Sequence, residues 1–126
     1  MRDVPALLEK ATTCLRSARL LLESGDHASA VNRAFYAMQH VATAALAREG
    51  AEPKSHSGLI SEFSQRFVRT GRVPANLGRA FNEAENERLV ADYTDRVSTP
   101  ERARYVVEQA EHFVAAVRAV LAAGSP

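Results

Sequence analysis

Arg33, Tyr36 and His40 are spaced three and four positions apart, so on a helix they would share one face. A guanidinium can hold a phosphate through two parallel hydrogen bonds, and an imidazole can accept or donate a proton near neutral pH. A phenol ring can stack on a nucleobase. These residues are candidates for a phosphate-bearing ligand, with Arg33 and His40 as candidate catalytic groups. The alternative is a helix buried on both sides, with Tyr36 and His40 satisfied inside the fold.

Arg88, Asp92 and Tyr93 form a second candidate set. Arg88 and Asp92 are four positions apart, so on a helix they would lie on one face and could pair. Either Arg88 is a functional cation that Asp92 holds in place, or the two residues form a structural salt bridge. We include Arg88 among the candidate catalytic residues. Asp92 and Tyr93, which stands at the predicted helix end, are candidate ligand-binding residues.

The polar segment KSHS supplies a third set, which comprises Lys54, His56 and Ser57. The segment precedes a predicted helix N-terminus, where free backbone amides and the helix dipole favour an anion. This pattern predicts a ligand-binding loop. The same pattern is also typical of a polar loop whose serine caps the helix.

Four arginines lie in a stretch without any acidic residue between Glu62 and Glu83: Arg66, Arg69, Arg72 and Arg79. Such a basic patch can hold phosphates by Coulomb attraction and by the release of counterions. A cluster of glutamates follows directly, at positions 83, 85 and 87. The alternative to a nucleic-acid surface is therefore charge pairing within the protein.

Composition limits the classes of protein to which this chain can belong. Its 126 residues fit a single domain over 1–126, and 46% hydrophobic with 25% charged residues is ordinary for a soluble globular protein. The net charge of +1 excludes a polybasic protein. The single cysteine, Cys14, excludes an intramolecular disulfide and a cysteine-based zinc site. No apolar run approaches the roughly 20 residues that span a bilayer, so we expect a cytoplasmic protein that does not associate with a membrane. We also expect no bound metal and no cofactor.

Five stretches of the sequence must position the candidate residues. Between punctuating Gly and Pro residues, apolar side chains recur every three or four positions, which is typical of amphipathic helices. The expected helices cover about 3–24, 27–49, 57–71, 74–93 and 100–123. The expected N-caps are Asp3, Asp26, Ser55 or Ser57, and Thr99. No stretch has the alternation of a strand. The sequence therefore predicts an all-α, up-and-down antiparallel bundle of four to five helices.

The second of these helices is unusual, because the side opposite its apolar stripe has few charged residues. That side carries Arg33, Tyr36 and His40 together with small residues, which are Ser29, Ala44 and Ala47. A lone surface helix would carry Glu and Lys there. Small residues beside hydrogen-bonding groups indicate a second contact surface, such as a dimer face.

Three fragments of the sequence together resemble the HEPN domain family: NRAFYAMQH, KSHSGLISEF and TGRVPANLGRAFNEAENERLVADY. They are followed by a closing helix rich in Ala, Val and Glu. The resemblance is to the small stand-alone proteins of bacteria and archaea, and it covers about Leu8 to Leu121. It implies a helical bundle that forms a homodimer.

The resemblance also implies a function. Many members are paired with a minimal nucleotidyltransferase in toxin–antitoxin systems, so the implied protein binds RNA or a nucleotide in a dimer cleft. Tyr36 and Tyr93 are candidate acceptors for nucleotide modification by such a partner. One alternative is a metal-independent endoribonuclease toxin, and another is a non-catalytic module for helical dimerisation or scaffolding.

Ribonuclease members of the family share an Arg that is followed, after four to six residues, by a His. The matching position here has Arg88 followed by Asp92, and a carboxylate does not supply the acid–base chemistry of an imidazole near neutral pH. Arg33 and His40 have six residues between them, but they lie in a different helix. A dimer could bring Arg33 of one chain close to His40 of the other.

Overall fold

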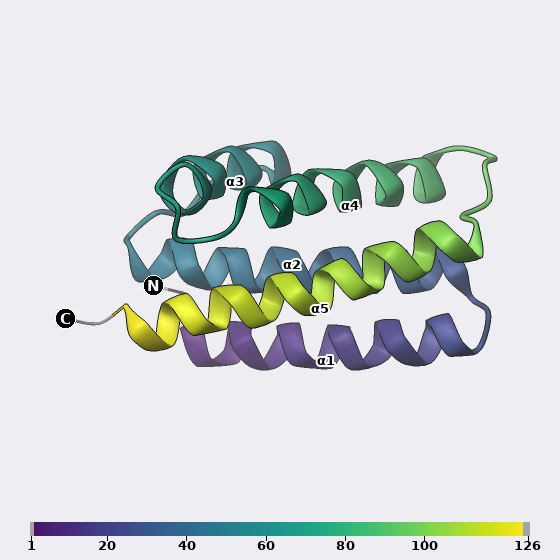
Figure 1. Ribbon diagram of the computed structural model, residues 1–126, viewed down its shortest axis with the longest axis horizontal. Helices are drawn as coiled ribbons and strands as arrows, with labels where there is room; N and C mark the ends of the chain where they lie inside the picture. Colours follow the sequence, from purple (N-terminus) through teal and green to yellow (C-terminus); the bar gives the residue numbers. More distant parts are fainter. Residues whose placement is uncertain (1, 125–126) are drawn as a thin grey trace.

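The computed structural model describes residues 2–124, and they form a bundle of helices (Figure 1). The elements are α1 (Val4–Glu23), α2 (His27–Arg48), α3 (His56–Phe63), the short π-helix η1 (Ser64–Val68), α4 (Ala75–Tyr93) and α5 (Pro100–Ala123). No strand occurs in this part of the chain, so the predicted all-α class is confirmed. None of the described helices is long and apolar enough to cross a membrane.

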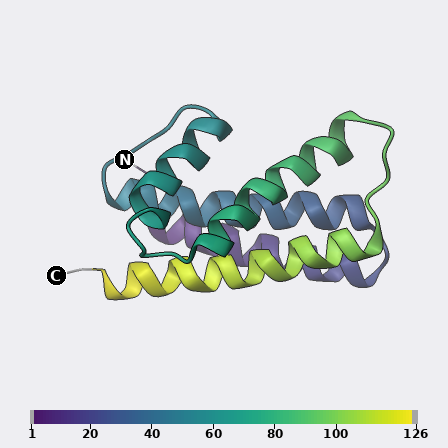
Figure 2. The same ribbon diagram turned by 45° about the horizontal axis from the view of Figure 1, so that its top comes forward.

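The four long helices alternate in direction along the chain, as an up-and-down bundle requires. In Figure 1, α1 and α4 run from left to right, whereas α2 and α5 run back from right to left. In Figure 2, α4 crosses α5 obliquely, and α3 lies beside the end at which α4 begins.

Polar side chains fix the starts of four helices where the sequence predicts caps. Each accepts a hydrogen bond from a backbone amide three residues on, at 3.0–3.2 Å; these residues are Asp3, Asp26, Ser55 and Thr99. Such caps satisfy amides that have no partner within the helix. Gly25 has a φ of +86° between α1 and α2, a conformation that side chains disfavour.

The third predicted helix differs from the expectation in its second half. It is α-helical only to Phe63 and then widens into η1, where the Arg69 amide donates to the Ser64 carbonyl oxygen five residues back. Phe63 and Phe67 both lie in the core, and their rings stack with centroids 5.0 Å apart. The spacing of apolar residues in the sequence does not reveal a single wide turn of this kind. Such turns are frequent at functional sites.

Helix α2 is the centre of the bundle and packs against α1, α3, α4 and α5 (Figure 1). Half of its residues are buried, including Ala30, Ala37 and Ala44. Ala44 is fully buried within this single chain, so the prediction that it faces a second contact surface is wrong. Short side chains at these positions let neighbouring helices come close to the α2 backbone.

An aromatic cluster fixes α3 and η1 against α4 and α5. The ring of Phe63 lies 5.9 Å from that of Phe81 and 5.3 Å from that of Phe113, measured between centroids. All three residues are almost completely buried. Because the cluster joins these helices, it fixes the spacing between α3 and α4, where a groove opens on the surface.

Candidate functional site

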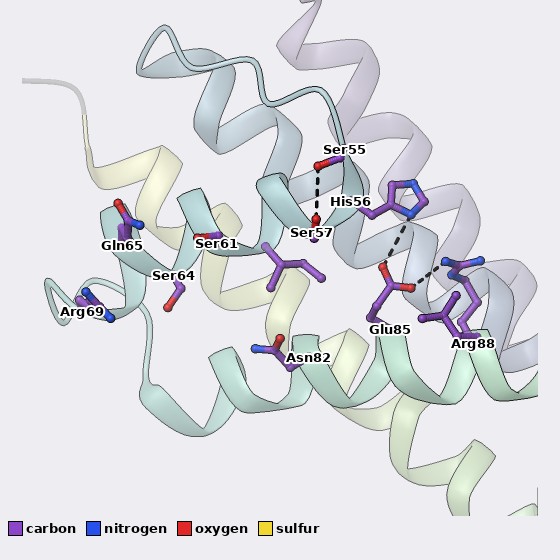
Figure 3. A pocket seen from close by; sticks show the side chains of 12 residues that line it. Ser55, His56, Ser57, Ser61, Ser64, Gln65, Arg69, Asn82, Glu85 and Arg88 are labelled. Carbon is purple, nitrogen blue, oxygen red and sulfur yellow. Dashed lines mark hydrogen bonds and ion pairs between the residues drawn. The ribbon is translucent and has the colours of Figure 1, made fainter.

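A groove of about 750 Å³ runs between α3 with η1 on one side and α4 on the other (Figure 3). We call it the α3–α4 groove. Ten of its twelve lining residues are polar or charged; the lining consists of Ser55, His56, Ser57, Ile60, Ser61, Ser64, Gln65, Arg69, Asn82, Glu85, Arg88 and Leu89. Hydroxyl and amide groups lie along its length, and charged groups gather at the end near His56 and Arg88.

Arg88 is a buried cation in the wall of this groove, with only 6% of its surface exposed. Its Nη2 donates to Glu85 Oε1 at 2.7 Å, and its Nη1 donates to Asp92 Oδ2 at 3.3 Å. Its guanidinium carbon lies 4.9 Å from the centre of the Phe35 ring and 5.7 Å from that of Tyr36. Its buried Nε has no hydrogen-bond partner in the described part of the chain.

The electrostatic surroundings keep Arg88 charged. Burial alone would lower the pKa of Arg88, because a low dielectric disfavours the charged form. The hydrogen bond and charge of Glu85, followed by Tyr36 and Asp92, outweigh the burial, so the pKa is raised. The result is a permanently cationic fork with one N–H donor still unpaired.

Glu85 links Arg88 to His56, which is the first residue of α3. The Nδ1 atom of His56 lies 3.6 Å from Glu85 Oε2 (Figure 3). The imidazole centroid lies 5.7 Å from that of Phe35 and 6.2 Å from that of Tyr36. A carboxylate beside one ring nitrogen orients an imidazole and leaves the other nitrogen for proton transfer.

Tyr36 joins two of the candidate sets that the sequence kept apart. The sequence grouped Tyr36 with Arg33 and His40, and the structure places its ring 5.2 Å from the Arg33 guanidinium carbon and 6.5 Å from the His40 ring. The same half-buried ring also meets Arg88 and His56. Four groups that can carry a positive charge therefore surround one phenol.

Sequence reasoning missed two residues of this network, Asn32 and Glu85. Asn32 donates to Asp92 Oδ2 at 3.4 Å and accepts from Arg33 Nε and Nη2 at 3.1 and 2.8 Å, so it connects α2 to α4. Glu85 was considered only as part of an acidic cluster. Its position three residues before Arg88 on a predicted helix was the available signal.

Arg33 and His40 face a separate hollow of about 500 Å³ between α1 and α2. We call it the α1–α2 hollow, and its lining consists of Ala6, Glu9, Lys10, Thr13, Cys14, Arg33 and His40. Arg33 Nη1 lies 3.9 Å from Cys14 Sγ. Both candidate residues thus share one hollow, which is separate from the groove that Arg88 lines.

We expect the free energy of unfolding to rise with pH just below the ordinary pKa of His40. Burial, followed by the charges of Lys10, Arg33 and Arg2, lowers the pKa of His40. Between its folded and unfolded pKa values the unfolded chain binds more protons, so acid destabilises the fold in that window. Urea unfolding at pH values from about 5 to 7 measures the slope. The slope should decrease in His40→Gln and persist in His112→Gln, a change at an exposed residue of α5.

The residues of the KSHS segment are divided between two places. Ser57 lies in the α3–α4 groove, with its Oγ 3.3 Å from that of Ser55, which caps α3. Lys54 is exposed and lines a neighbouring hollow of about 390 Å³, together with Gln39 and Thr43. His56 borders both spaces. Tyr93 ends α4 with 76% of its surface exposed and does not line the α3–α4 groove.

The four arginines of the acid-free stretch do not share one environment. Arg66 pairs with Glu62 and Glu49 at 2.8 and 3.5 Å, and Arg72 also pairs with Glu49. Arg69 lines the α3–α4 groove, whereas Arg79 is exposed on α4. Charge pairing within the protein therefore occurs, but with Glu49 and Glu62 rather than with the cluster at 83–87.

Fold and site together define a small helical-bundle protein with a polar groove and a buried arginine network at one end. The model of the HEPN domain family matches residues 4–120, and the chain belongs to this family. No three His, Cys, Asp or Glu side chains within residues 2–124 are grouped closely enough to hold a metal ion.

Similar proteins agree with this assignment. A protein of Methanocaldococcus jannaschii named as a candidate toxin is 36% identical over 119 residues, which are 94% of this chain and 89% of that protein. A UPF0332 protein of Thermotoga maritima is 34% identical over 113 residues, which are 89% of this chain and 86% of that protein. The crystal structure of TT1696 from Thermus thermophilus has the same fold, with a TM-score of 0.79 at 23% identity, over 94% of this chain and 98% of that one.

Proposed function

We propose that this HEPN protein is a toxin-type protein that binds the phosphates of RNA or of a nucleotide in the α3–α4 groove. The observation that carries the proposal is Arg88, a cation that lines the groove and is held in its wall by Glu85 and Asp92. Two relatives from Methanocaldococcus jannaschii that are named as candidate toxins support the toxin class.

The groove offers the donors that a sugar–phosphate backbone needs. Arg88 and Arg69 lie along it as cations, and hydroxyl groups of Ser57, Ser61 and Ser64 line it. Charge-assisted hydrogen bonds from arginine to phosphate are roughly twice as strong as neutral ones. Glu85 holds the guanidinium in place but also repels an anion. We therefore expect the phosphate to depend on arginine and hydroxyl donors together.

Filling the groove should weaken ligand binding without changing the fold. Ser61 is exposed on α3 and lines the groove, so Ser61→Trp places a large ring where the ligand would lie. Fluorescence anisotropy with a labelled 2′-O-methyl oligoadenylate, which lacks the 2′-hydroxyl needed for cleavage, measures binding. We expect at least a tenfold loss of affinity, about 1.4 kcal/mol.

Ala115→Trp is the matched control, because Ala115 is exposed on α5 and lies outside the groove. The control should bind as the wild type does. Equal binding by the Ser61 and Ala115 variants would place the ligand elsewhere. Absence of binding by the wild type would favour the scaffold alternative.

A specific observation favours a second candidate function, metal-independent endoribonuclease activity. Asp92 stands where the ribonuclease members of the family have a His. The groove nevertheless contains an imidazole, that of His56, which lies beside Glu85, the ion-pair partner of Arg88. In the reaction that we propose, His56 takes the proton of a ribose 2′-hydroxyl and the 2′-oxygen attacks the adjacent phosphorus. The bond from phosphorus to the 5′-oxygen breaks, and this oxygen takes a proton from water. The products are a 2′,3′-cyclic phosphate and a 5′-hydroxyl.

The family resemblance implies a homodimer and a minimal nucleotidyltransferase partner, and both stay predictions. Exposed apolar side chains near the end of α4 support a contact surface there: Leu89 is 40% exposed, Tyr93 76% and Val97 87%. Light scattering of the purified protein measures its oligomeric state.

A further inference from the structure

Positive charge around Tyr36 comes from two separate places, which distinguishes this surface from a site for a single phosphate. Arg88 and His56 line the α3–α4 groove, whereas Arg33 and His40 line the α1–α2 hollow. The Tyr36 ring centre is within 6 Å of both guanidinium carbons, at 5.2 Å from Arg33 and 5.7 Å from Arg88. The half-buried ring is thus a platform between two cationic places.

The cations of the α1–α2 hollow form no ion pair within the described residues. Within residues 2–124, neither Lys10 nor Arg33 forms an ion pair, and the partner of the Arg33 fork is the neutral amide oxygen of Asn32. Glu9 also lines the hollow and offsets one of these charges. Burial is the largest cause of the lowered pKa of His40, and the charges of Lys10 and Arg33 act in the same direction. By contrast, Glu49 and Glu62 neutralise Arg66 and Arg72, in the basic stretch that the sequence indicated.

We infer that the α1–α2 hollow is a second phosphate subsite, and that the ligand is a single-stranded RNA whose successive phosphates lie on either side of Tyr36. This inference rests on the proposed function, and it narrows the ligand from RNA or nucleotide to an RNA strand. The nucleoside between the two phosphates stacks on the phenol ring. Stacking of a base on an aromatic side chain contributes about 1–3 kcal/mol and tolerates any base.

A comparison of ligands with one and two phosphates tests this inference. The probes are adenosine 5′-monophosphate and a 5′-phosphorylated diadenylate with 2′-O-methyl groups, and calorimetry measures their affinities. We expect the dinucleotide to bind at least about tenfold more tightly, or 1.4 kcal/mol. Lys10→Gln should remove most of this gain, reduce the salt slope of dinucleotide binding by about 0.7, and leave binding of the mononucleotide unchanged.

Two further variants make the test specific. Arg16→Gln is the control, because Arg16 is exposed on the same helix as Lys10 and lies outside the α1–α2 hollow. Arg33→Gln should act as Lys10→Gln does, and its thermal unfolding checks whether loss of the bonds to Asn32 disturbs the fold. Lys10 is exposed and has no ion pair within the described residues, so Lys10→Gln folds even if Arg33→Gln does not.

The possible results separate this inference from the proposed function. Equal affinity for the two probes, or equal salt slopes in Lys10→Gln and Arg16→Gln, would overturn the second subsite. In that case the α3–α4 groove would still be supported as a binding site by two results. The mononucleotide would compete with oligoadenylate for the wild type, and Ser61→Trp would prevent its binding. If neither probe binds, the proposed function itself fails.

Discussion

The variant His56→Ala is expected to cleave RNA between about 100-fold and 10,000-fold more slowly than the wild type, which is the usual contribution of a general acid or base. His56 is the imidazole in the α3–α4 groove, and its Nδ1 lies 3.6 Å from Glu85. Without it, no group of the network takes the 2′-hydroxyl proton readily near neutral pH. The measurement is the rate at which 2′,3′-cyclic phosphate ends form on a labelled RNA in the presence of EDTA.

His112→Ala separates this function of His56 from general effects of losing a histidine. His112 is exposed on α5 and lines neither the α3–α4 groove nor the α1–α2 hollow, so this variant should retain cleavage. Added imidazole should restore part of the activity of His56→Ala. Glu85→Gln should slow cleavage, because the amide no longer orients the imidazole as the carboxylate does. Equal cleavage by wild type and His56→Ala would rule out His56 as the proton acceptor.

Local sequence signals predicted the helices and the pair within α4. Caps at Asp3, Asp26 and Thr99 lie where the sequence places them, because a cap involves residues only three positions apart. The contact of Arg88 with Asp92 is likewise an interaction within one helical turn. Interactions of this range are encoded in spacing, so periodicity and residue type are sufficient to predict them.

The meeting of Tyr36 with His56 and Arg88 could not be predicted in the same way. These residues come from three helices, and their contact depends on how Phe63, Phe81 and Phe113 fix α3 against α4. Helical spacing assigns a residue to a face but does not state which helix covers that face. For the same reason the sequence analysis predicted separate candidate sites on the second helix and in the KSHS segment.

The burial of Ala44 shows a second limit of sequence patterns. A one-sided apolar stripe predicts a helix with one covered face, whereas α2 is covered by four neighbours. Alanine fits both a solvent-exposed face and a close helix contact, so its position on the helix does not decide between them. Polar residues of the remaining strip, such as Asn32 and Tyr36, are partly exposed and show where α2 reaches the surface.

Arg88→Met is expected to reduce both stability and binding, because Arg88 is a buried charge and a ligand group at once. Removing one partner of a buried ion pair costs about 3–5 kcal/mol, since the other charges stay behind without compensation. We expect the lower end of this range, because Asp92 retains 33% of its side-chain exposure. Urea unfolding followed by circular dichroism measures the change, and Arg104→Met, at an exposed residue of α5, is the control.

The double variant Arg88→Met with Glu85→Gln distinguishes the two contributions of Arg88. Neutralising Glu85 removes the carboxylate with the shortest ion pair to Arg88, at 2.7 Å, so the double variant should regain much of the lost stability. It should not regain binding of the 2′-O-methyl oligoadenylate, because the phosphate has lost its cation. Arg88→Lys keeps a charge but lacks the planar fork, so it should bind weakly as well. A stable double variant that binds RNA as the wild type does would show that Arg88 only supports the fold.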